Sequence, residues 1–394
     1  MPSLKAHAIT RVVNANAMAR LGFKTVMIAP RRYGVPLRLD RLYEPLFFKI
    51  ILLPFVDLQY LLKLFRVRVE AVSTHRLKAF LNNLSMASFM VSLLFFLLPM
   101  LIVERGKKLA FLVSEGIILS LFIIIKGFLK RRLKIVYELH DLPDRTSYII
   151  SRAFFIALLK RVDVLVALSR SVASAFTKLL HEKITVLPHG YDSTLYPKLS
   201  INRLRRILNL PLSKKIILYS GSLPAECKSE LLIEFVDLLV NKFGLKDVLL
   251  LILGKPVQEL IRLRRIASAK RLNGYVLLKE YAPHNVLPLY LKSADVLLLW
   301  GIPAGINPAK LPEYIGAERP LLIPSIDELT RLSSEDGIGL VYNVFDPLDL
   351  AKKTHDLLLD NKLYQHVLYN VKKVALKWEA TERARKLVRL VFHT

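Results

Sequence analysis

Residues 162–192, VDVLVALSRSVASAFTKLLHEKITVLPHGYD, decide the fold class of this chain. Two short apolar runs, 163–168 and 183–187, flank a stretch with helical periodicity, and Ser169 is a typical N-cap for a helix that ends at Leu180. A strand, a helix and a second strand in this order form the unit from which parallel sheets are built. The segment therefore predicts an α/β domain with a parallel sheet.

The same alternation continues in both directions along the chain. Before the segment we expect strands at 24–29, 100–104 and 134–139 and helices at 15–21, 107–128 and 147–160. After it we expect strands at 215–220, 247–253, 275–279, 295–299 and 320–323 and helices at 229–242, 256–271, 285–292, 308–316 and 347–359.

Two such series in one chain predict two Rossmann-like domains with parallel sheets that face each other across a cleft. The first domain is expected at 1–197 and the second at 198–375, with the connection within 192–214. The basic helix at the end of the chain, within 376–394, is expected to return toward the first domain.

The composition favours anionic partners. The chain has 394 residues, 53% of them hydrophobic, and 59 Lys and Arg against 32 Asp and Glu give a net charge of +27. Residues 1–198 hold 30 basic and 12 acidic residues, a net of +18, and the remainder carries the other +9. Such a charge suits lipid headgroups, phosphorylated substrates or nucleic acid, although it can also serve solubility alone.

The single cysteine, Cys227, cannot form an internal disulfide, and the sequence has no Cys/His cluster typical of a metal site. We therefore expect no metal ion and a reducing compartment. The N-terminal residues MPSLKAHAIT lack the apolar region of a secretory signal, so none is expected.

Residues 84–103, LSMASFMVSLLFFLLPMLIV, carry no charge and are long enough to span a bilayer. A transmembrane helix is one interpretation. The other, favoured by the alternation, is a helix at 73–98 with one face in a core and one at the lipid interface, ended by Pro99 and followed by a buried strand at 100–104. Because this half is both apolar and basic, we expect a peripheral or monotopic protein on the cytoplasmic face of a membrane.

Loops that follow strands are the candidate functional sites, because ligands of open parallel sheets bind at the carboxyl ends of the strands. Gly221 permits close backbone approach, and Lys228 could add a charge to a diphosphate at the next helix. A strand–glycine–helix turn is also a common structural feature. In residues 307–314, NPAKLPEY, Glu313 could accept two ribose hydroxyl groups or could only stabilise the start of a helix.

Two further loops carry polar side chains. His140 and Asp141 end the strand at 134–139, where a histidine could bind a sugar hydroxyl or act as an acid or base, although a lone histidine is more often structural. His189 and Asp192 lie in the turn PHGYD that closes the last strand of the first domain, and Asp192 could equally cap a tight turn.

The order and spacing of these loops resemble the family-4 retaining glycosyltransferases of the GT-B superfamily. Residues 162–192 resemble the strand–helix–strand segment of that family, 219–239 (YSGSLPAECKSELLIEFVDLL) its phosphate loop, and 308–324 (PAKLPEYIGAERPLLIP) its nucleotide-binding helix. Residues 337–358 and 376–391 resemble its C-terminal signatures. The resemblance extends from about residue 134 to the end.

The resemblance implies roles for individual residues. Glu313 would bind the ribose of a nucleotide-diphosphate sugar, and His140 would face the donor sugar near its anomeric carbon. Donor binding is implied for Gly221, Ser222, Lys228, Asn307, Pro308, Ala309, Lys310 and Glu313, and contact with the cleft or acceptor for Asp141, His189 and Asp192. Transfer would retain the anomeric configuration, with Lys228 stabilising the leaving group and with no metal.

The sequence departs from the family pattern at three positions. Gly305 replaces the first glutamate of the Glu-x7-Glu motif, which puts contacts with the donor sugar in doubt. Ser222 replaces the arginine of the phosphate loop, and His189 replaces the asparagine of the turn.

We therefore expect a retaining glycosyltransferase that uses a nucleotide sugar and a membrane lipid or lipid-linked glycan as acceptor. The alternative is a catalytically inactive membrane scaffold, or a subunit of a glycosyltransferase complex, with the same fold. No G-x-G-x-x-G follows a predicted strand, which argues against a nicotinamide enzyme. Nucleic acid is not an expected partner, because no recognisable reading motif accompanies the charge.

Overall fold

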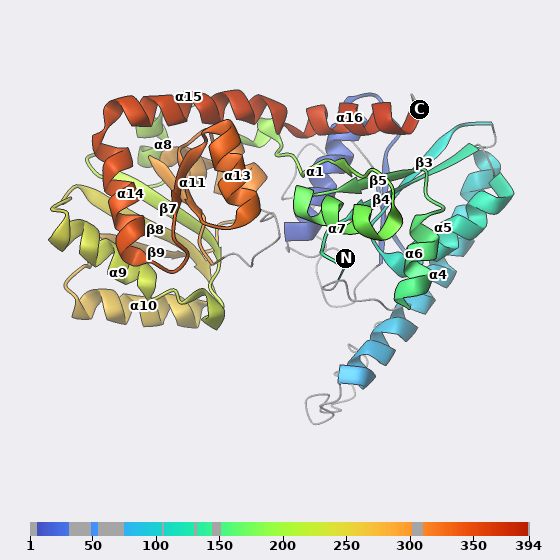
Figure 1. The fold of residues 1–394 in the computed structure, drawn as a ribbon, viewed down its shortest axis with the longest axis horizontal. Helices are drawn as coiled ribbons and strands as arrows, with labels where there is room; N and C mark the ends of the chain where they lie inside the picture. The colour runs from blue at the N-terminus through green and yellow to red at the C-terminus, as the bar shows by residue number, and fades with distance from the viewer. Residues whose placement is uncertain are drawn as a thin grey trace. The chain divides into compact units, whose positions relative to one another are not determined.

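The computed structural model describes residues 6–30, 49–53, 75–104, 106–129, 132–143, 151–301 and 310–392. The chain divides into two compact units (Figure 1). Unit 1 is Met1–Pro188 together with Arg383–Thr394, and unit 2 is His189–Glu382. Each unit has its own parallel sheet and its own apolar core.

Unit 1 contains a four-stranded parallel sheet in the order β3-β4-β5-β6. The strands are β3 (Leu109–Val113), β4 (Leu133–Leu139), β5 (Val164–Ala167) and β6 (Thr185–Val186). A separate parallel pair joins β1 (Val26–Pro30) to β2 (Lys49–Leu53). The described helices of unit 1 are α1 (Ala6–Arg20), α4 (His75–Val103), α5 (Gly116–Leu129), α6 (Arg152–Leu159) and α7 (Arg170–Leu180).

The segment that decides the fold class behaves as predicted. Ser169 caps α7, since its hydroxyl accepts a hydrogen bond from the Val172 amide at 3.2 Å. Strands β5 and β6 flank the helix and pair in parallel. The apolar residues of α7 then face the core of unit 1.

The prediction of a strand at 100–104 is wrong. Helix α4 continues through Pro99 to Val103, and the strand lies further on, at β3, inside the predicted helix 107–128. A proline inside a helix removes one backbone hydrogen bond, but Pro99 lies on the exposed face of α4. A buried stripe on the other face, Phe89, Leu93, Leu97 and Leu101, packs into the core and holds the helix together.

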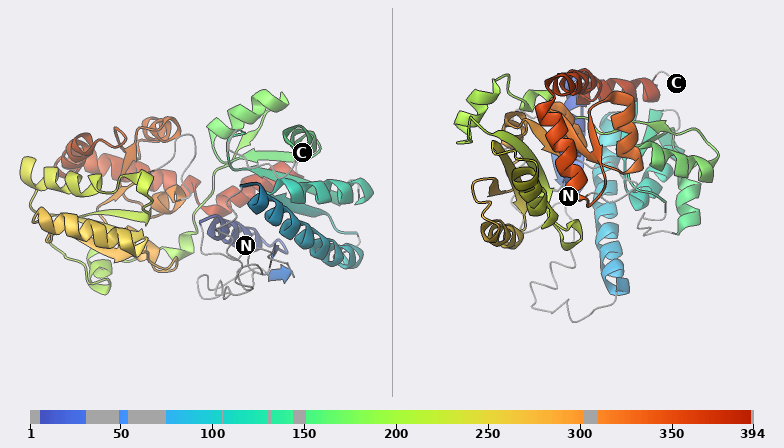
Figure 2. Two further views of the ribbon diagram at one scale, coloured as in Figure 1. Left: turned by 90° about the horizontal axis from the view of Figure 1, so that it is seen from below. Right: turned by 60° about the vertical axis from the view of Figure 1, so that its left-hand side comes forward.

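Unit 2 contains a six-stranded parallel sheet in the order β12-β11-β10-β7-β8-β9. The strands are β7 (Lys215–Ser222), β8 (Val248–Lys255), β9 (Val276–Glu280), β10 (Val296–Leu298), β11 (Leu321–Pro324) and β12 (Gly339–Tyr342). The sheet carries helices on both faces, as in a doubly wound fold (Figure 2). These helices are α8 (Ile201–Ile207), α9 (Leu231–Asp237), α10 (Val257–Ala269), α11 (Leu287–Ser293), α12 (Leu311–Gly316), α13 (Asp327–Asp336), α14 (Pro347–Leu359) and α15 (Asn361–Lys377).

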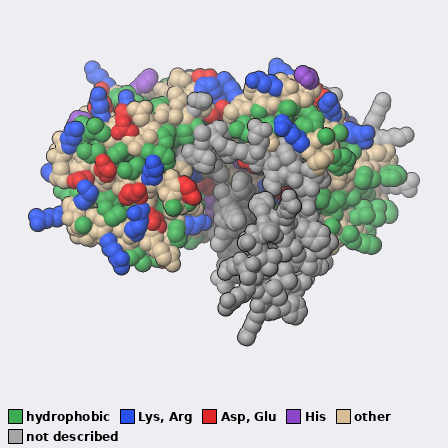
Figure 3. All heavy atoms as spheres, turned by 60° about the horizontal axis from the view of Figure 1, so that its bottom comes forward, with side chains coloured by type: hydrophobic (Ala, Val, Ile, Leu, Met, Phe, Trp, Pro, Cys, Tyr) green, Lys and Arg blue, Asp and Glu red, His purple; other side chains and the backbone are tan. Residues whose placement is uncertain are grey.

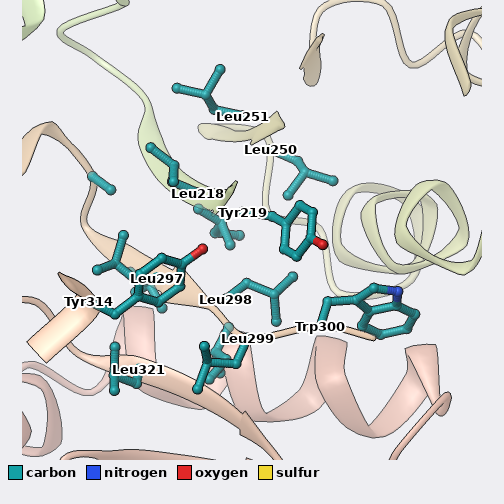
Figure 4. Packing of buried hydrophobic residues seen from close by; sticks show 14 of the residues in the cluster. Leu218, Tyr219, Leu250, Leu251, Leu297, Leu298, Leu299, Trp300, Tyr314 and Leu321 are labelled. Atoms are coloured by element: carbon teal, nitrogen blue, oxygen red, sulfur yellow. The ribbon is translucent and has the colours of Figure 1, made fainter. Parts of the chain in front are cut away.

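Burial on both faces of the unit 2 sheet explains why the sequences of its strands are continuous apolar runs. Every residue of β8 except Lys255 is buried, as expected for a strand covered on both faces. Leucines of β7, β8 and β10 pack around Tyr219, Trp300 and Tyr314 (Figure 4). These large side chains stand at the carboxyl end of the sheet, beside the loops that form the candidate site.

The last helix, α16 (Ala380–Phe392), reaches unit 1. From Arg383 onward its residues belong to that unit, where Leu387 and Val391 pack against Val136 and Leu187. The boundary of unit 2 at Pro188 and His189 lies nine residues before the sequence-based boundary at 197, and α8 lies in the segment expected to be a connection.

Candidate functional site

The strand order of unit 2 indicates where a ligand can bind. Strand β7 is the first strand of the unit, and it pairs with β8 on one side and β10 on the other. The chain therefore changes direction across the sheet between β7 and β10. In doubly wound sheets ligands bind outside the carboxyl ends of the two strands at this switch point. The loops after β7 and β10 hold most of the residues that the sequence predicts for donor binding.

Gly221 is the next-to-last residue of β7 and pairs with Gly254 of β8. Its φ is +153°, in a region that residues with a side chain rarely adopt. A Cβ at this position would lie 2.5 Å from Nζ of Lys310 and 3.1 Å from the hydroxyl of Tyr219. Glycine thus allows the end of β7 to approach a lysine that comes from the other side of the switch point.

Lys310 precedes α12, and its ammonium lies 4.3 Å from the centroid of the Tyr219 ring. Burial lowers the pKa of Lys310 to about 8, although nearby Cys227 and Glu313 act in the opposite direction. Among the residues that the structure describes, Lys310 forms no ion pair. A partly dehydrated cation at the switch point is suited to receive an anionic group of a ligand.

Glu313 is on the first turn of α12, and its Oε1 lies 3.1 Å from Nδ1 of His284, which is buried in the loop after β9. The carbonyl oxygen of Glu313 accepts a hydrogen bond of 2.7 Å from the Tyr196 hydroxyl. The next residue, Tyr314, fixes the helix to the sheet, because its hydroxyl accepts a 2.8 Å hydrogen bond from the Ser220 amide on β7. Glu313 and the loop after β7 are thereby held at the same edge of the sheet.

Lys228 ends the short turn Ala225–Cys227 with a positive φ of 45°. Its Nζ lies 5.1 Å from the centroid of the Phe345 ring, in the loop after β12. Trp300, directly after β10, holds the loop that contains Cys227 and Lys228, because its indole N–H donates a 2.8 Å hydrogen bond to the Cys227 carbonyl. Lys228 is therefore placed at the same edge as Lys310, on the side of β12.

The structure brings five of the predicted donor-binding residues to one edge of unit 2: Gly221, Ser222, Lys228, Lys310 and Glu313. Asn307, Pro308, Ala309 and the departure at Gly305 lie outside the described residues. The sequence reasoning missed His284. The histidine in the run YAPH after strand β9 was the available signal for His284.

His140 and Asp141 lie in unit 1, directly after β4. Asp141 is exposed, whereas His140 is half-buried and its Nε2 lies 3.5 Å from Oε2 of Glu138. Glu138 is buried and also pairs with the guanidinium of Arg383 on α16. The Nε of Arg383 donates a 2.9 Å hydrogen bond to the Pro188 carbonyl. The sequence reasoning missed this cluster because Arg383 comes from a part of the chain far from Glu138 and His140.

His189 and Asp192 belong to unit 2, where both are buried. Oδ1 of Asp192 accepts hydrogen bonds from the amide and the hydroxyl of Thr194, at 3.1 and 2.7 Å. Asp192 thus caps the next turn, as the structural interpretation of this residue expected. Contact of His189 and Asp192 with an acceptor stays a prediction.

The comparisons with known proteins agree with this architecture. Residues 200–374 match the family model described as Glycosyl transferases group 1. No curated protein matches the sequence.

Solved structures share the fold at low sequence identity. Sucrose-phosphate synthase from Thermosynechococcus elongatus superposes with a TM-score of 0.68 and 15% identity, over 98% of this chain and 92% of that one. HepE from Anabaena, solved in complex with UDP, gives a TM-score of 0.69 and 12% identity, over 98% and 96%. WaaG, a glycosyltransferase involved in lipopolysaccharide biosynthesis, gives 0.60 and 15%, over 98% and 96%.

These findings define the class of protein. The two units with parallel sheets have the GT-B fold, as predicted. Residues 200–374, within unit 2, match the glycosyl transferases group 1, and this match together with the fold supports a transferase. Membership of family 4 within that group stays a prediction.

Proposed function

We propose that this glycosyltransferase moves a sugar from a nucleoside-diphosphate sugar to a membrane lipid or lipid-linked glycan, with retention of the anomeric configuration. The observation that carries the donor assignment is the position of Lys310 and Glu313. Lys310 directly precedes one short helix and Glu313 lies on its first turn, and Lys310 lies against Gly221 near the end of β7, at the switch point of the sheet.

The negative and positive side chains of the site suit the two ends of a nucleoside diphosphate. Glu313 is an acceptor for the hydroxyl groups of a ribose, and the cations of Lys310 and Lys228 suit the diphosphate. A bound diphosphate would stabilise the charge of Lys310, which burial has deprived of hydration. HepE, which shares the fold, has been solved with UDP and with UDP-glucose, which supports a donor of this kind.

Catalysis in this proposal is electrostatic. The departing nucleoside diphosphate gains negative charge as its bond to the anomeric carbon of the donor sugar breaks. Positive groups already in place stabilise that charge. Lys310 and Lys228 supply them without a protein nucleophile. His140 contacts the donor sugar near the anomeric carbon, as the family resemblance implies, and Glu138 holds its ring in place.

We further propose that the reaction needs no metal ion. Among the described residues no group of three or more His, Cys, Asp and Glu side chains could hold one. The proposal predicts that transfer persists in the presence of EDTA, and loss of transfer that added Mg²⁺ or Mn²⁺ restores would contradict it.

The acceptor and the location at the cytoplasmic face of a membrane are supported by unit 1. Helix α4 includes Ser85–Val103, 19 residues with a mean hydropathy of 2.5, long and apolar enough to cross a membrane by length and composition. The basic charge of residues 1–198 suits anionic lipid headgroups.

The experiment is an assay of sugar transfer to a membrane lipid extract, with nucleoside-diphosphate sugars chosen by first screening UDP, GDP and ADP for thermal stabilisation. Proton NMR of the product then gives the anomeric configuration. We expect one nucleotide to stabilise the protein and the product to keep the donor configuration. Inversion would contradict the mechanism, and donor binding without any transfer would favour the inactive scaffold.

A further inference from the structure

Helix α4 of unit 1 has two opposite faces of different exposure. The side chains of Phe89, Leu93, Leu97 and Leu101 recur every four residues and are buried in the core of unit 1. The opposite face carries large apolar side chains that are exposed, namely Val91, Phe95, Leu98 and Ile102. A helix in water normally places polar residues on such a face.

Helix α5 extends this exposed apolar face. It lies beside α4, as Figures 1 and 2 show, and the two helices share the core of unit 1. Ile124 and Phe128, one helical turn apart, are exposed on α5. Phe95 is 72% exposed and Phe128 is 84% exposed, so little of the described part of unit 1 covers them. Figure 3 shows hydrophobic side chains gathered on this side of unit 1, at the right of the view.

We propose that the exposed residues of α4 and α5 form a docking face that inserts into one leaflet of an anionic membrane. We call this set the α4–α5 face: Val91, Phe95, Leu98, Ile102, Ile124 and Phe128. The inference extends the proposed function, because it assigns the surface that would bring a membrane-bound acceptor to the enzyme.

The chemistry of the face favours lipid over a protein partner. Its six side chains offer no hydrogen-bond donor or acceptor, whereas protein interfaces typically form about one hydrogen bond per 100–200 Å². The segment that contains the face is basic, since the sequence from 85 to 132 holds seven Lys and Arg against two Glu, a net of +5. Lys107 and Lys108 are exposed directly after α4. Apolar side chains bordered by cations are typical of segments that bind at the surface of anionic bilayers.

The buried stripe of α4 argues against a membrane-spanning helix. Residues 89–101 pack against unit 1 along one side, so a spanning α4 would carry the neighbouring sheet into the hydrocarbon. Strand β3 stands at the end of the strand order among the described residues, and hydrocarbon cannot satisfy the polar backbone groups of an open sheet edge. Shallow insertion of one face avoids this cost. The structure therefore assigns α4 to the membrane surface.

The experiment is flotation of the full-length protein with vesicles of phosphatidylcholine and phosphatidylglycerol, in the absence of nucleotide. The variant Phe95→Asp/Phe128→Asp should bind at least about tenfold more weakly than the wild type, because each substitution removes an exposed aromatic ring that would insert into the bilayer. The matched control Leu359→Asp/Leu376→Asp changes two exposed leucines of unit 2 and should bind like the wild type. Binding should also weaken with salt and on pure phosphatidylcholine.

Several outcomes would overturn the inference. They are wild-type protein that does not float, a Phe variant that floats as well as the control, and protein that resists extraction from membranes by alkaline carbonate. A lipid-free dimer that the Phe substitutions separate would instead assign the face to a second copy of the chain.

A second measurement covers the case in which the Asp variant does not fold. The Phe128→Trp variant should show fluorescence quenching by brominated lipids beyond that of the wild type, and no added quenching would contradict the inference. Because these assays contain no nucleotide, a failure here is separate from a failure of donor binding.

Discussion

The ammonium of Lys310 lies 4.3 Å from the ring centroid of Tyr219, although the two residues belong to different segments that flank the switch point of the unit 2 sheet. This contact places a partly dehydrated cation beside Gly221, near the end of β7. It connects the fold of unit 2 to its proposed chemistry, because the strand order that creates the switch point also creates the contact.

The first prediction concerns the pH dependence of donor binding. Because burial lowers the pKa of Lys310 to about 8, the free protein loses this charge as pH rises through 8. The affinity for a nucleoside diphosphate should therefore stay constant from about pH 7 to 8 and fall above pH 8. The fall should be absent in Lys310→Met, which should bind more weakly than the wild type at pH 7. An identical pH profile in the variant would contradict the assignment of the charge to Lys310.

The lowered pKa of Lys310 also affects stability, in the opposite direction. The donor affinity falls as pH rises, whereas the free energy of unfolding rises. The unfolded chain keeps the Lys310 proton up to its ordinary pKa of 10.5, whereas the folded protein releases it near 8. The unfolded state thus binds more protons between these values, and the burial penalty is relieved as pH rises. Lys310→Met should raise the free energy of unfolding at pH 7, with a gain that shrinks toward pH 10. Urea unfolding at both pH values measures this difference, and a loss of stability at pH 7 would contradict it.

A second prediction concerns Gly221. The Gly221→Ala substitution places a Cβ where the Lys310 ammonium lies, at a φ that costs a residue with a side chain about 1–3 kcal/mol. The flexible lysine end can move aside, so donor affinity should fall by about tenfold or more while the unit stays folded. Calorimetric titration and thermal unfolding separate the two effects. In a Lys310→Met background the same glycine substitution should weaken binding much less.

A third prediction tests the packing of α12 in unit 2. A Cβ on Gly316 would lie 2.3 Å from the buried ring of Tyr191, so Gly316→Ala should destabilise the protein by about 1–3 kcal/mol. Gly274→Ala is the matched control, because no atom lies within 4 Å of the added Cβ. Chemical denaturation of both variants measures the difference, and equal stability of the two would show that the described packing is wrong.

A fourth prediction concerns the pair formed by Arg383 and Glu138 in unit 1. Both side chains are buried, and Arg383→Met leaves the carboxylate of Glu138 without its cation. Breaking a buried pair from one side typically costs about 3–5 kcal/mol. The double variant Arg383→Met/Glu138→Gln should recover part of that stability, as a double-mutant cycle measures. Additive losses in the cycle would contradict a direct pair.

The sequence predicted the elements whose local signals and tertiary environment agree. The apolar runs of β4, β5 and β7 and the N-cap at Ser169 are of this kind. The strand predicted at 100–104 failed because hydropathy does not distinguish a buried strand from a helix with one buried stripe, and Pro99 suggested a helix end. Strand β12 and helices α13 and α15 were not predicted at all.

The candidate site was predictable only in part. The loops after β7 and before α12 are at the expected edge of unit 2, because the edge of a parallel sheet follows from the alternation of strands and helices. The position of the Lys310 ammonium depends on the strand order, which the sequence pattern did not give. The pair of Glu138 and Arg383 joins residues 245 positions apart and has no local signature.

The most direct test of the central claim is calorimetric titration of the protein with UDP, GDP and ADP at pH 7. We expect one nucleotide to bind the wild type and the control variant Lys352→Ala, which changes an exposed lysine on α14. Glu313→Gln and Lys310→Met should each bind it about tenfold or more weakly while remaining folded. Equal affinity in all four proteins would contradict a donor site between the loop after β7 and helix α12.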